Sequence, residues 1–338
     1  MPNLAAPNLN KDNDHMNPRW ALLGLAIATG VHAADDARLQ PGRLRLLALD
    51  PTQLREVVPG AVYMGHWFGS HQSTALFRFP PAAISTAPAK LAFHSHGTEF
   101  AVQVAGDSEI IDERRRRYPL REGDVVLVKA NVRHTGSFGS TENRILSVVT
   151  PARPEYPPED GTAYFPGHGQ PAAAAAPART DYSGPTVRTL FNLGAVESDL
   201  VSDPASGVAF RHWHGDDVSV AVTRLRRDGA THRAAPHAVH GEELAWLVRG
   251  RMHYDAPGLG EVTAEPGQAV VLPPYRAHSA ECLTDECLIV SWHSPRRDEW
   301  GPEGRLPPIE LITTGAGAVA TAHPTQCPCK KDTAAEGM

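Results

Sequence analysis

The chain has 338 residues, of which 41% are hydrophobic and 21% are charged, which is ordinary for a soluble globular protein with room for two domains. Its formal net charge of -6 and its sequence pI of about 6.3 argue against a nucleic-acid-binding surface. The composition therefore predicts no nucleic-acid partner.

The first predicted element is a secretory signal peptide at residues 1–34, with Met16 as an alternative start. Residues 17–19 form a short basic region, residues 20–30 are apolar, and residues 31–33 offer the small side chains that signal peptidase reads. A buried amino-terminal helix is the alternative. The apolar stretch is too short for a stable membrane anchor. We therefore expect a periplasmic or secreted protein without membrane insertion after cleavage.

Short strand patterns follow, and helix patterns are few. β-branched or apolar runs bounded by turn residues occupy residues 124–128, 218–225, 244–248, 268–272 and 288–292. Short strands separated by frequent turns predict an all-β sandwich or barrel.

Three segments lie outside this strand pattern. Four consecutive arginines, residues 114–117, predict a solvated hairpin turn, with an anion site as the alternative. Residues 152–185 are rich in proline and alanine and predict an extended linker. Residues 309–338 predict a mostly disordered tail, in which the apolar stretch through Ile312 is a candidate docked segment.

The cysteines form two pairs. Cys282 and Cys287 flank a predicted hairpin tip, so a disulfide across it is expected in an oxidising compartment. Cys327 and Cys329 lie too close together to pair readily with each other. They are free, paired elsewhere, or part of a metal-binding tail.

The chain also repeats itself at an offset of about 144 residues. Glu99 and Gly106 recur as Glu243 and Gly250, and Gly123 and His134 recur as Gly267 and His278. This repeat predicts two copies of one domain, at residues 36–151 and 186–308.

Side chains that can hold a metal gather in each copy. In the first, His94 and His96 are two apart on a predicted strand and face the same way. Glu99 and His134 complete a set of three histidines and one carboxylate, a common way to bind a divalent ion with open positions. A barrel lined by hydrogen-bonded histidines without metal is the alternative.

The second copy offers His237, His240, Glu243 and His278. The two histidines of its first pair are three apart, so on a regular strand they would point to opposite faces. Either a β-bulge brings His240 inward, or this copy has lost a ligand.

These motifs resemble those of the cupin superfamily, HxH(x)3–4E(x)6G and G(x)5PxG(x)2H. The resemblance covers residues 60–151 and 206–300 and implies a bicupin, with two tandem all-β cupin (double-stranded β-helix or jelly-roll) barrels. It implies a divalent metal ion, iron or manganese ahead of zinc, nickel or copper. The implied ligands are His94, His96, Glu99 and His134, and His237, His240, Glu243 and His278. Only two residues separate His96 from Glu99, where the cupin motif has three or four. One expectation is that this shorter spacer places Glu99 outside the coordination sphere.

The closing strand of the second copy also resembles that of single cupins that open unsaturated uronate rings. Ser291 and His293 stand where that family has an aspartate and an aromatic residue, so the activity is not transferred. His293 is a candidate catalytic acid–base residue, and a strand-end cap is the alternative.

His66-Trp67 recurs as His212-Trp213, which predicts tryptophan in the core and histidine at the rim. A copper-handling role for His212 and His214 is the alternative.

The expected function is a metal-dependent enzyme acting on a small oxygenated organic compound, with oxygenase chemistry ahead of isomerase or lyase chemistry. The alternative is a non-catalytic exported metal- or sugar-binding protein. The expected partner is a small-molecule substrate. Cupins often dimerise, so a homodimer is among the expected assemblies.

Overall fold

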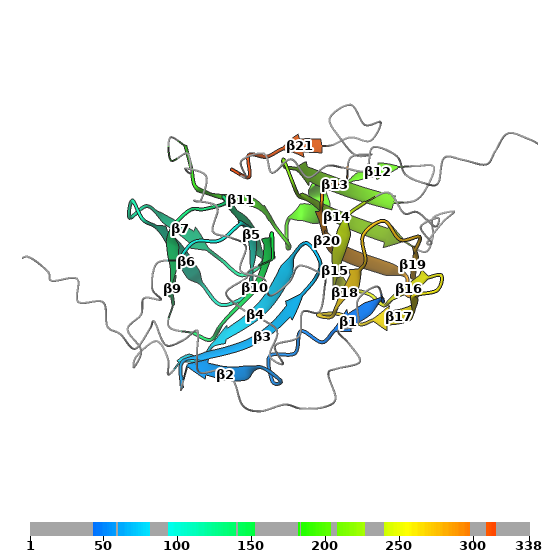
Figure 1. Ribbon diagram of the computed structural model, residues 1–338, viewed down its shortest axis with the longest axis horizontal. Helices are drawn as coiled ribbons and strands as arrows, with labels where there is room; N and C mark the ends of the chain where they lie inside the picture. The colour runs from blue at the N-terminus through cyan, green and yellow to red at the C-terminus, as the bar shows by residue number, and fades with distance from the viewer. Residues whose placement is uncertain are drawn as a thin grey trace, which may run out of the picture.

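The computed structural model describes residues 43–58, 60–81, 94–139, 141–152, 182, 184–203, 208–226, 240–297 and 309–315. Within these ranges the protein is nearly all β-strand, arranged as two barrels side by side (Figure 1). The predicted all-β fold is confirmed, and all five predicted runs are strands. None of the described helices is long and apolar enough to cross a membrane.

The first barrel pairs a seven-stranded sheet with a three-stranded sheet. The large sheet has the order β11 (Val187–Asn192), β8 (Asp124–Val128), β5 (Thr98–Ala105), β10 (Asn143–Thr150), β4 (Ser73–Phe79), β3 (Val62–Phe68) and β2 (Arg55–Val58). The small sheet has the order β7 (Arg117–Leu120), β6 (Ser108–Asp112) and β9 (His134–Phe138).

The second barrel repeats this plan. Its eight-stranded sheet has the order β1 (Arg45–Leu47), β18 (Ala269–Leu272), β15 (Glu242–Arg249), β20 (Glu286–Ser294), β14 (Ser219–Arg226), β13 (Val208–His214) and β12 (Val201–Asp203), and β21 (Ile309–Leu311) also pairs with β13. Its small sheet has the order β17 (Gly260–Ala264), β16 (Met252–Ala256) and β19 (Ser279–Cys282). A short 3-10 helix, η3 (Val196–Asp199), follows β11.

The two barrels exchange strands, which differs from the predicted boundaries. β1 lies in the segment expected for the first barrel but pairs with β18 of the second, and β11 makes the reciprocal crossing to β8 of the first. Leu47 and Phe191, on the exchanged strands, pack in a core shared by both barrels. The exchange covers an edge of each large sheet, and an uncovered edge would invite pairing with another chain.

The shared core explains why the central strands read as continuous apolar runs. On β5, Phe100 and Val102 are fully buried against the other barrel, while Glu99 and Gln103 point to the opposite side. From the second barrel, Trp246 and other residues of the facing sheet enter the same cluster. The central strands of each large sheet are therefore buried on both faces, as in stacked sheets.

A contact between matching residues marks the symmetry of the pair. Thr150 Oγ1 and Ser294 Oγ, which end β10 and β20, lie 2.7 Å apart in a hydrogen bond. These positions correspond in the two copies, so the ends of matching strands meet where the two barrels are in contact.

The segment after the second barrel departs from the predicted disorder. Ile312 is buried and donates its backbone N–H to His214 O, and Thr314 is fully buried with its carbonyl accepting from Ala130 N. The apolar stretch through Ile312 is docked, in line with its expected role as a candidate docked segment, whereas the expected disorder is wrong for residues 313–315, because Thr314 is buried and its carbonyl is paired with the first barrel.

The arginine run forms the predicted hairpin turn between β6 and β7, but it is not simply solvated. Arg116 donates to the buried carboxylate of Asp112 at 2.7 Å and to Gly184 O at 2.8 Å. Arg114 donates to Tyr182 O at 3.0 Å. Through these hydrogen bonds, the arginines of the hairpin turn bind the end of the predicted linker to the first barrel.

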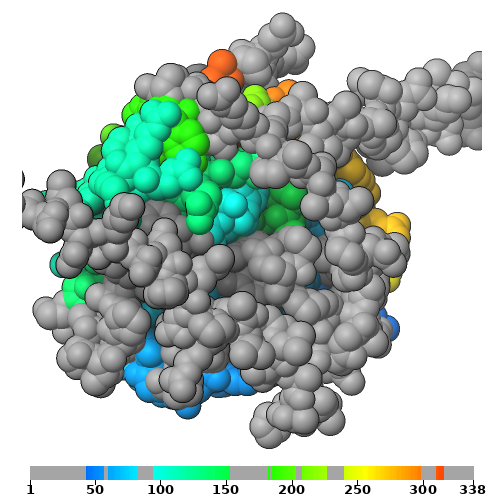
Figure 2. Space-filling view, turned by 60° about the vertical axis from the view of Figure 1, so that its left-hand side comes forward, coloured from blue at the N-terminus to red at the C-terminus, as the bar shows by residue number. Residues whose placement is uncertain are grey.

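The expected disulfide is present, between Cys282 and Cys287. Residues 1–34, most of the predicted linker, His237, and Cys327 with Cys329 lie outside the described residues. Figure 2 shows another face, on which the cyan and green surface of the first barrel lies above the blue surface of its early strands.

Candidate metal centres

The predicted ligands of the first barrel converge inside it. The ligand atoms of His94, His96 and His134 all lie within 4.8 Å of one another. Glu99 joins them, with its Oε2 3.3 Å from both His96 Nε2 and His134 Nε2. Three strand segments contribute, because His94 forms a β-bridge with His134 and Glu99 lies on β5.

Backbone carbonyls orient two of these imidazoles. His96 Nδ1 lies 3.0 Å from Gly97 O, and His134 Nδ1 lies 2.9 Å from Val132 O. A carbonyl only accepts, so each Nδ1 donates its proton there, and in the neutral imidazole each Nε2 then keeps a lone pair that faces the centre. The hydroxyl of Ser147 donates to the other oxygen of Glu99 and orients that carboxylate.

The shortened spacer between His96 and Glu99 does not remove Glu99 from the cluster. The chain turns tightly at Gly97, where an added Cβ would lie 2.2 Å from Thr150 O. That close approach, which only glycine permits, brings Glu99 back towards the histidines within two intervening residues.

A second cluster occupies the other barrel. The ligand atoms of His240, Glu243 and His293 lie within 4.8 Å of one another, and His278 Nε2 is 3.2 Å from His240 Nε2. His240 Nδ1 lies 2.8 Å from Gly241 O, which repeats the orientation of His96. His278 Nδ1 lies 2.8 Å from Arg276 O, as His134 is held in the first barrel.

His240 is part of the second cluster, whereas its predicted partner His237 lies outside the described residues. His240 precedes β15, which starts at Glu242, so the alternation of side chains along a strand does not apply to it. At the repeat offset His240 matches His96. Each of these histidines is followed directly by a glycine, and a glutamate stands three residues after the histidine. The position of His94 is taken by Ala238. A strict offset of 144 residues therefore aligns His240 with the first-barrel candidate ligand His96.

His293, the candidate acid–base residue, lies within the second cluster. It is fully buried on β20, directly across from Glu243 on β15, and its Nε2 is 3.6 Å from Glu243 Oε2. The first barrel has Val149 at this position, across from Glu99.

The pKa shifts of the two carboxylates and of His240 favour the forms that bind metal ions. Burial raises the pKa of Glu99, but His96 and His134 outweigh it and hold the pKa well below its usual value. Glu243 is buried too, and His293 and His240 keep its pKa well below the ordinary value. Burial lowers the pKa of His240. Ionised carboxylates and neutral imidazoles are the ligand forms that divalent ions require.

The second barrel buries further polar groups outside its cluster. His212 and His214 are buried on β13, so the prediction of histidine at the rim is wrong for His212, whereas Trp213 is buried as expected. Burial, together with His293, lowers the pKa of His212 to about 2. Tyr254 is also buried, and burial and then Glu243 raise its pKa well above 10.0. The tyrosine is therefore a neutral hydroxyl.

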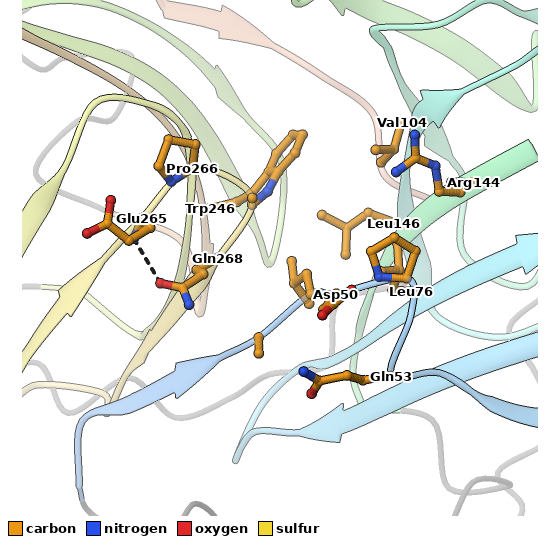
Figure 3. A pocket seen from close by; sticks show the side chains of 14 residues that line it. Asp50, Gln53, Leu76, Val104, Arg144, Leu146, Trp246, Glu265, Pro266 and Gln268 are labelled. Atoms are coloured by element: carbon orange, nitrogen blue, oxygen red, sulfur yellow. Dashed lines mark hydrogen bonds between the residues drawn. The ribbon is translucent and has the colours of Figure 1, made fainter.

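A separate cavity of about 470 Å³ lies between the two barrels (Figure 3). Trp246 and Gln268 line it from the second barrel, and Leu76 and Arg144 from the first. None of the metal-ligand candidates lines this cavity.

The strand plan and the two clusters together decide the fold class. Each barrel pairs a large sheet with a small one, and a histidine–glutamate cluster lies inside each. The predicted architecture of two tandem all-β jelly-roll barrels is confirmed.

No protein-family model matches the chain, and no curated protein sequence matches it. Several solved structures are similar to it. A cupin 2 conserved barrel domain protein from Leptotrichia buccalis has 12% identity and a TM-score of 0.48, covering 74% of this chain and 96% of that chain. Oxalate decarboxylase from Lactobacillus farciminis has 14% identity and a TM-score of 0.49, covering 80% and 88%. AerE from Microcystis aeruginosa has 14% identity and a TM-score of 0.49, covering 75% and 97%.

Proposed function

We propose that this bicupin is an exported metalloenzyme that acts on a small oxygenated organic compound, by oxygenase chemistry ahead of isomerase or lyase chemistry. The observation that carries the proposal is the convergence of three imidazoles and one carboxylate in the first barrel, at His94, His96, His134 and Glu99. Nitrogen and oxygen donors in this combination fit a divalent ion, with iron or manganese ahead of zinc, nickel or copper. Such an ion, when bound, supplies Lewis acidity or, if iron, the means to activate dioxygen.

The protein's own residues prepare the site for that role. Ser147 holds one oxygen of Glu99, and carbonyl groups hold His96 and His134, so three donors are preorganised. His94 is less buried than the other two histidines, which places the accessible side of the cluster next to it. Four protein donors leave room for a small ligand on a six-coordinate ion.

Export rests on the amino-terminal signal pattern, and the Cys282–Cys287 disulfide is consistent with an oxidising compartment. Fractionation of cells expressing the full chain, with amino-terminal sequencing of the mature protein, tests this part. Cleavage near residue 34 is expected. A product that retains residues 20–30 and stays in the cytoplasm contradicts it.

The metal is tested on untagged protein by elemental analysis after purification, alongside the His94→Ala variant. We expect bound iron or manganese in the native protein, and we expect the variant to lose the metal that is bound in the first barrel. Oxygen consumption is then measured with a panel of small hydroxy and keto acids. A metal-free native protein that takes up no divalent ion overturns the metalloenzyme, whereas stable metal binding without turnover of any panel compound favours the non-catalytic binding protein.

A further inference from the structure

The two clusters have the same donor types but draw them from different strands. In the first, His94 precedes β5 and forms the β-bridge with His134. The matching residue of the second copy is Ala238, whose methyl group cannot bind a metal. The second copy nevertheless places a third imidazole in its cluster, from His293 on β20.

We propose that the second barrel holds its own metal ion through His240, Glu243, His278 and His293, with His293 replacing the ligand that His94 provides in the first barrel. This assignment rests on the proposed metal-binding function and changes its ligand set, because the sequence motif implies His237 instead. It also gives His293 a coordinating role in place of acid–base catalysis.

Cross-strand pairing supports this ligand set. His293 and Glu243 are direct partners on neighbouring antiparallel strands, and such partners have side chains on the same face of the sheet. Their functional atoms are 3.6 Å apart, and the His293 and His240 rings are 4.9 Å apart between centroids. The 3.6 Å distance is comparable to that between two ligand atoms of one metal ion, because each ligand atom lies about 2.0–2.2 Å from the metal.

The comparison with the first barrel supports it independently. Val149 faces Glu99 in the same register in which His293 faces Glu243, so the first barrel has an imidazole at position 94 and none on its closing strand. The second barrel has the reverse arrangement. Each copy therefore keeps three histidines and one glutamate, although the third histidine has moved.

The variant His293→Val tests the proposal, because it installs the residue that the first barrel tolerates at the same position. Metal-depleted native protein and variants are titrated with Co²⁺, and both stoichiometry and the visible absorption spectrum are recorded. We expect about two equivalents for the native protein, with the second site lost or weakened by about 100-fold or more in His293→Val. His237→Ala is the matched control and is expected to bind like the native protein.

The outcomes separate the hypotheses. If the native protein binds no metal, the proposed function fails. If it binds two equivalents and His293→Val also binds two with an unchanged spectrum, only the assignment of His293 fails. Loss of turnover in His293→Val with both ions retained identifies an acid–base residue and overturns the proposal, as does metal loss in His237→Ala. Circular dichroism melting of metal-free protein verifies that each variant is folded.

Discussion

A buried carboxylate joins the first barrel to the candidate metal centre of the second, and its removal provides a stringent test of this contact. Glu242 is fully buried beside the candidate ligand Glu243. Its carboxylate accepts hydrogen bonds from Ser70 N and from Ser70 Oγ at 2.7 Å, and from Gln72 N at 3.2 Å. Those donors belong to the turn between β3 and β4 of the first barrel.

The expected effect of Glu242→Gln follows from these contacts. Hydrogen bonds to a charged group contribute about 1.5–3 kcal/mol each, and leaving a buried donor unsatisfied costs about 1–3 kcal/mol. Glutamine keeps one acceptor oxygen but turns an NH₂ group towards backbone donors. We therefore expect the free energy of unfolding to fall by about 3–5 kcal/mol, a large fraction of a typical stability of about 5–15 kcal/mol.

Urea unfolding of metal-free protein, followed by intrinsic tryptophan fluorescence, measures this change without a contribution from bound ions. Glu261→Gln is the control, since the Glu261 side chain is 76% exposed, and it should change stability by less than about 0.5 kcal/mol. Gly69→Ala should mimic the loss of Glu242, because an added Cβ would lie 1.8 Å from Glu242 Oε1.

A double-mutant cycle with Ser70→Ala isolates the contact itself. Because Ser70 Oγ acts through Glu242, its removal should have much less effect in the Glu242→Gln background than in the native one. Additive effects, or a loss below about 1 kcal/mol for Glu242→Gln with an unchanged urea dependence, would show that the turn does not hold this carboxylate.

Three further outcomes are expected. Burial raises the pKa of Asp217 from 3.8 to about 6, so its ionisation destabilises the folded state, and the free energy of unfolding should fall as pH rises from about 4 to 6. In urea unfolding at different pH values, Asp217→Asn should recover about 1–3 kcal/mol at pH 7 but little at pH 4. Replacing Cys282 and Cys287 by serine should lower stability by about 2 kcal/mol because the closed loop is short, and reductant should then have no further effect in thermal melts. Leu47→Ala, on the exchanged strand β1, should cost about 2–5 kcal/mol in urea unfolding, and a smaller loss would contradict its burial in the shared core.

Local patterns were sufficient for the fold class and for most of the candidate ligands. Short apolar runs between turn residues identify strands, since the period of side chains along a strand is a local property. Glu99 and Glu243 stand at matching positions of a repeat, so the duplication and the metal-binding chemistry both follow from the order of residues alone. The Cys282–Cys287 disulfide was predictable for the same reason, because it closes a short hairpin.

Strand pairing decided the rest. The exchange of β1 and β11 depends on which sheet edges meet when two barrels pack, and no local spacing encodes that. His293 lies far along the chain from His240, and only the antiparallel register of β20 against β15 places it opposite Glu243. The sequence by itself determined which chemical groups each copy possesses, whereas the tertiary structure decided which of them meet, because distances between strands are set by barrel closure rather than by separation along the chain.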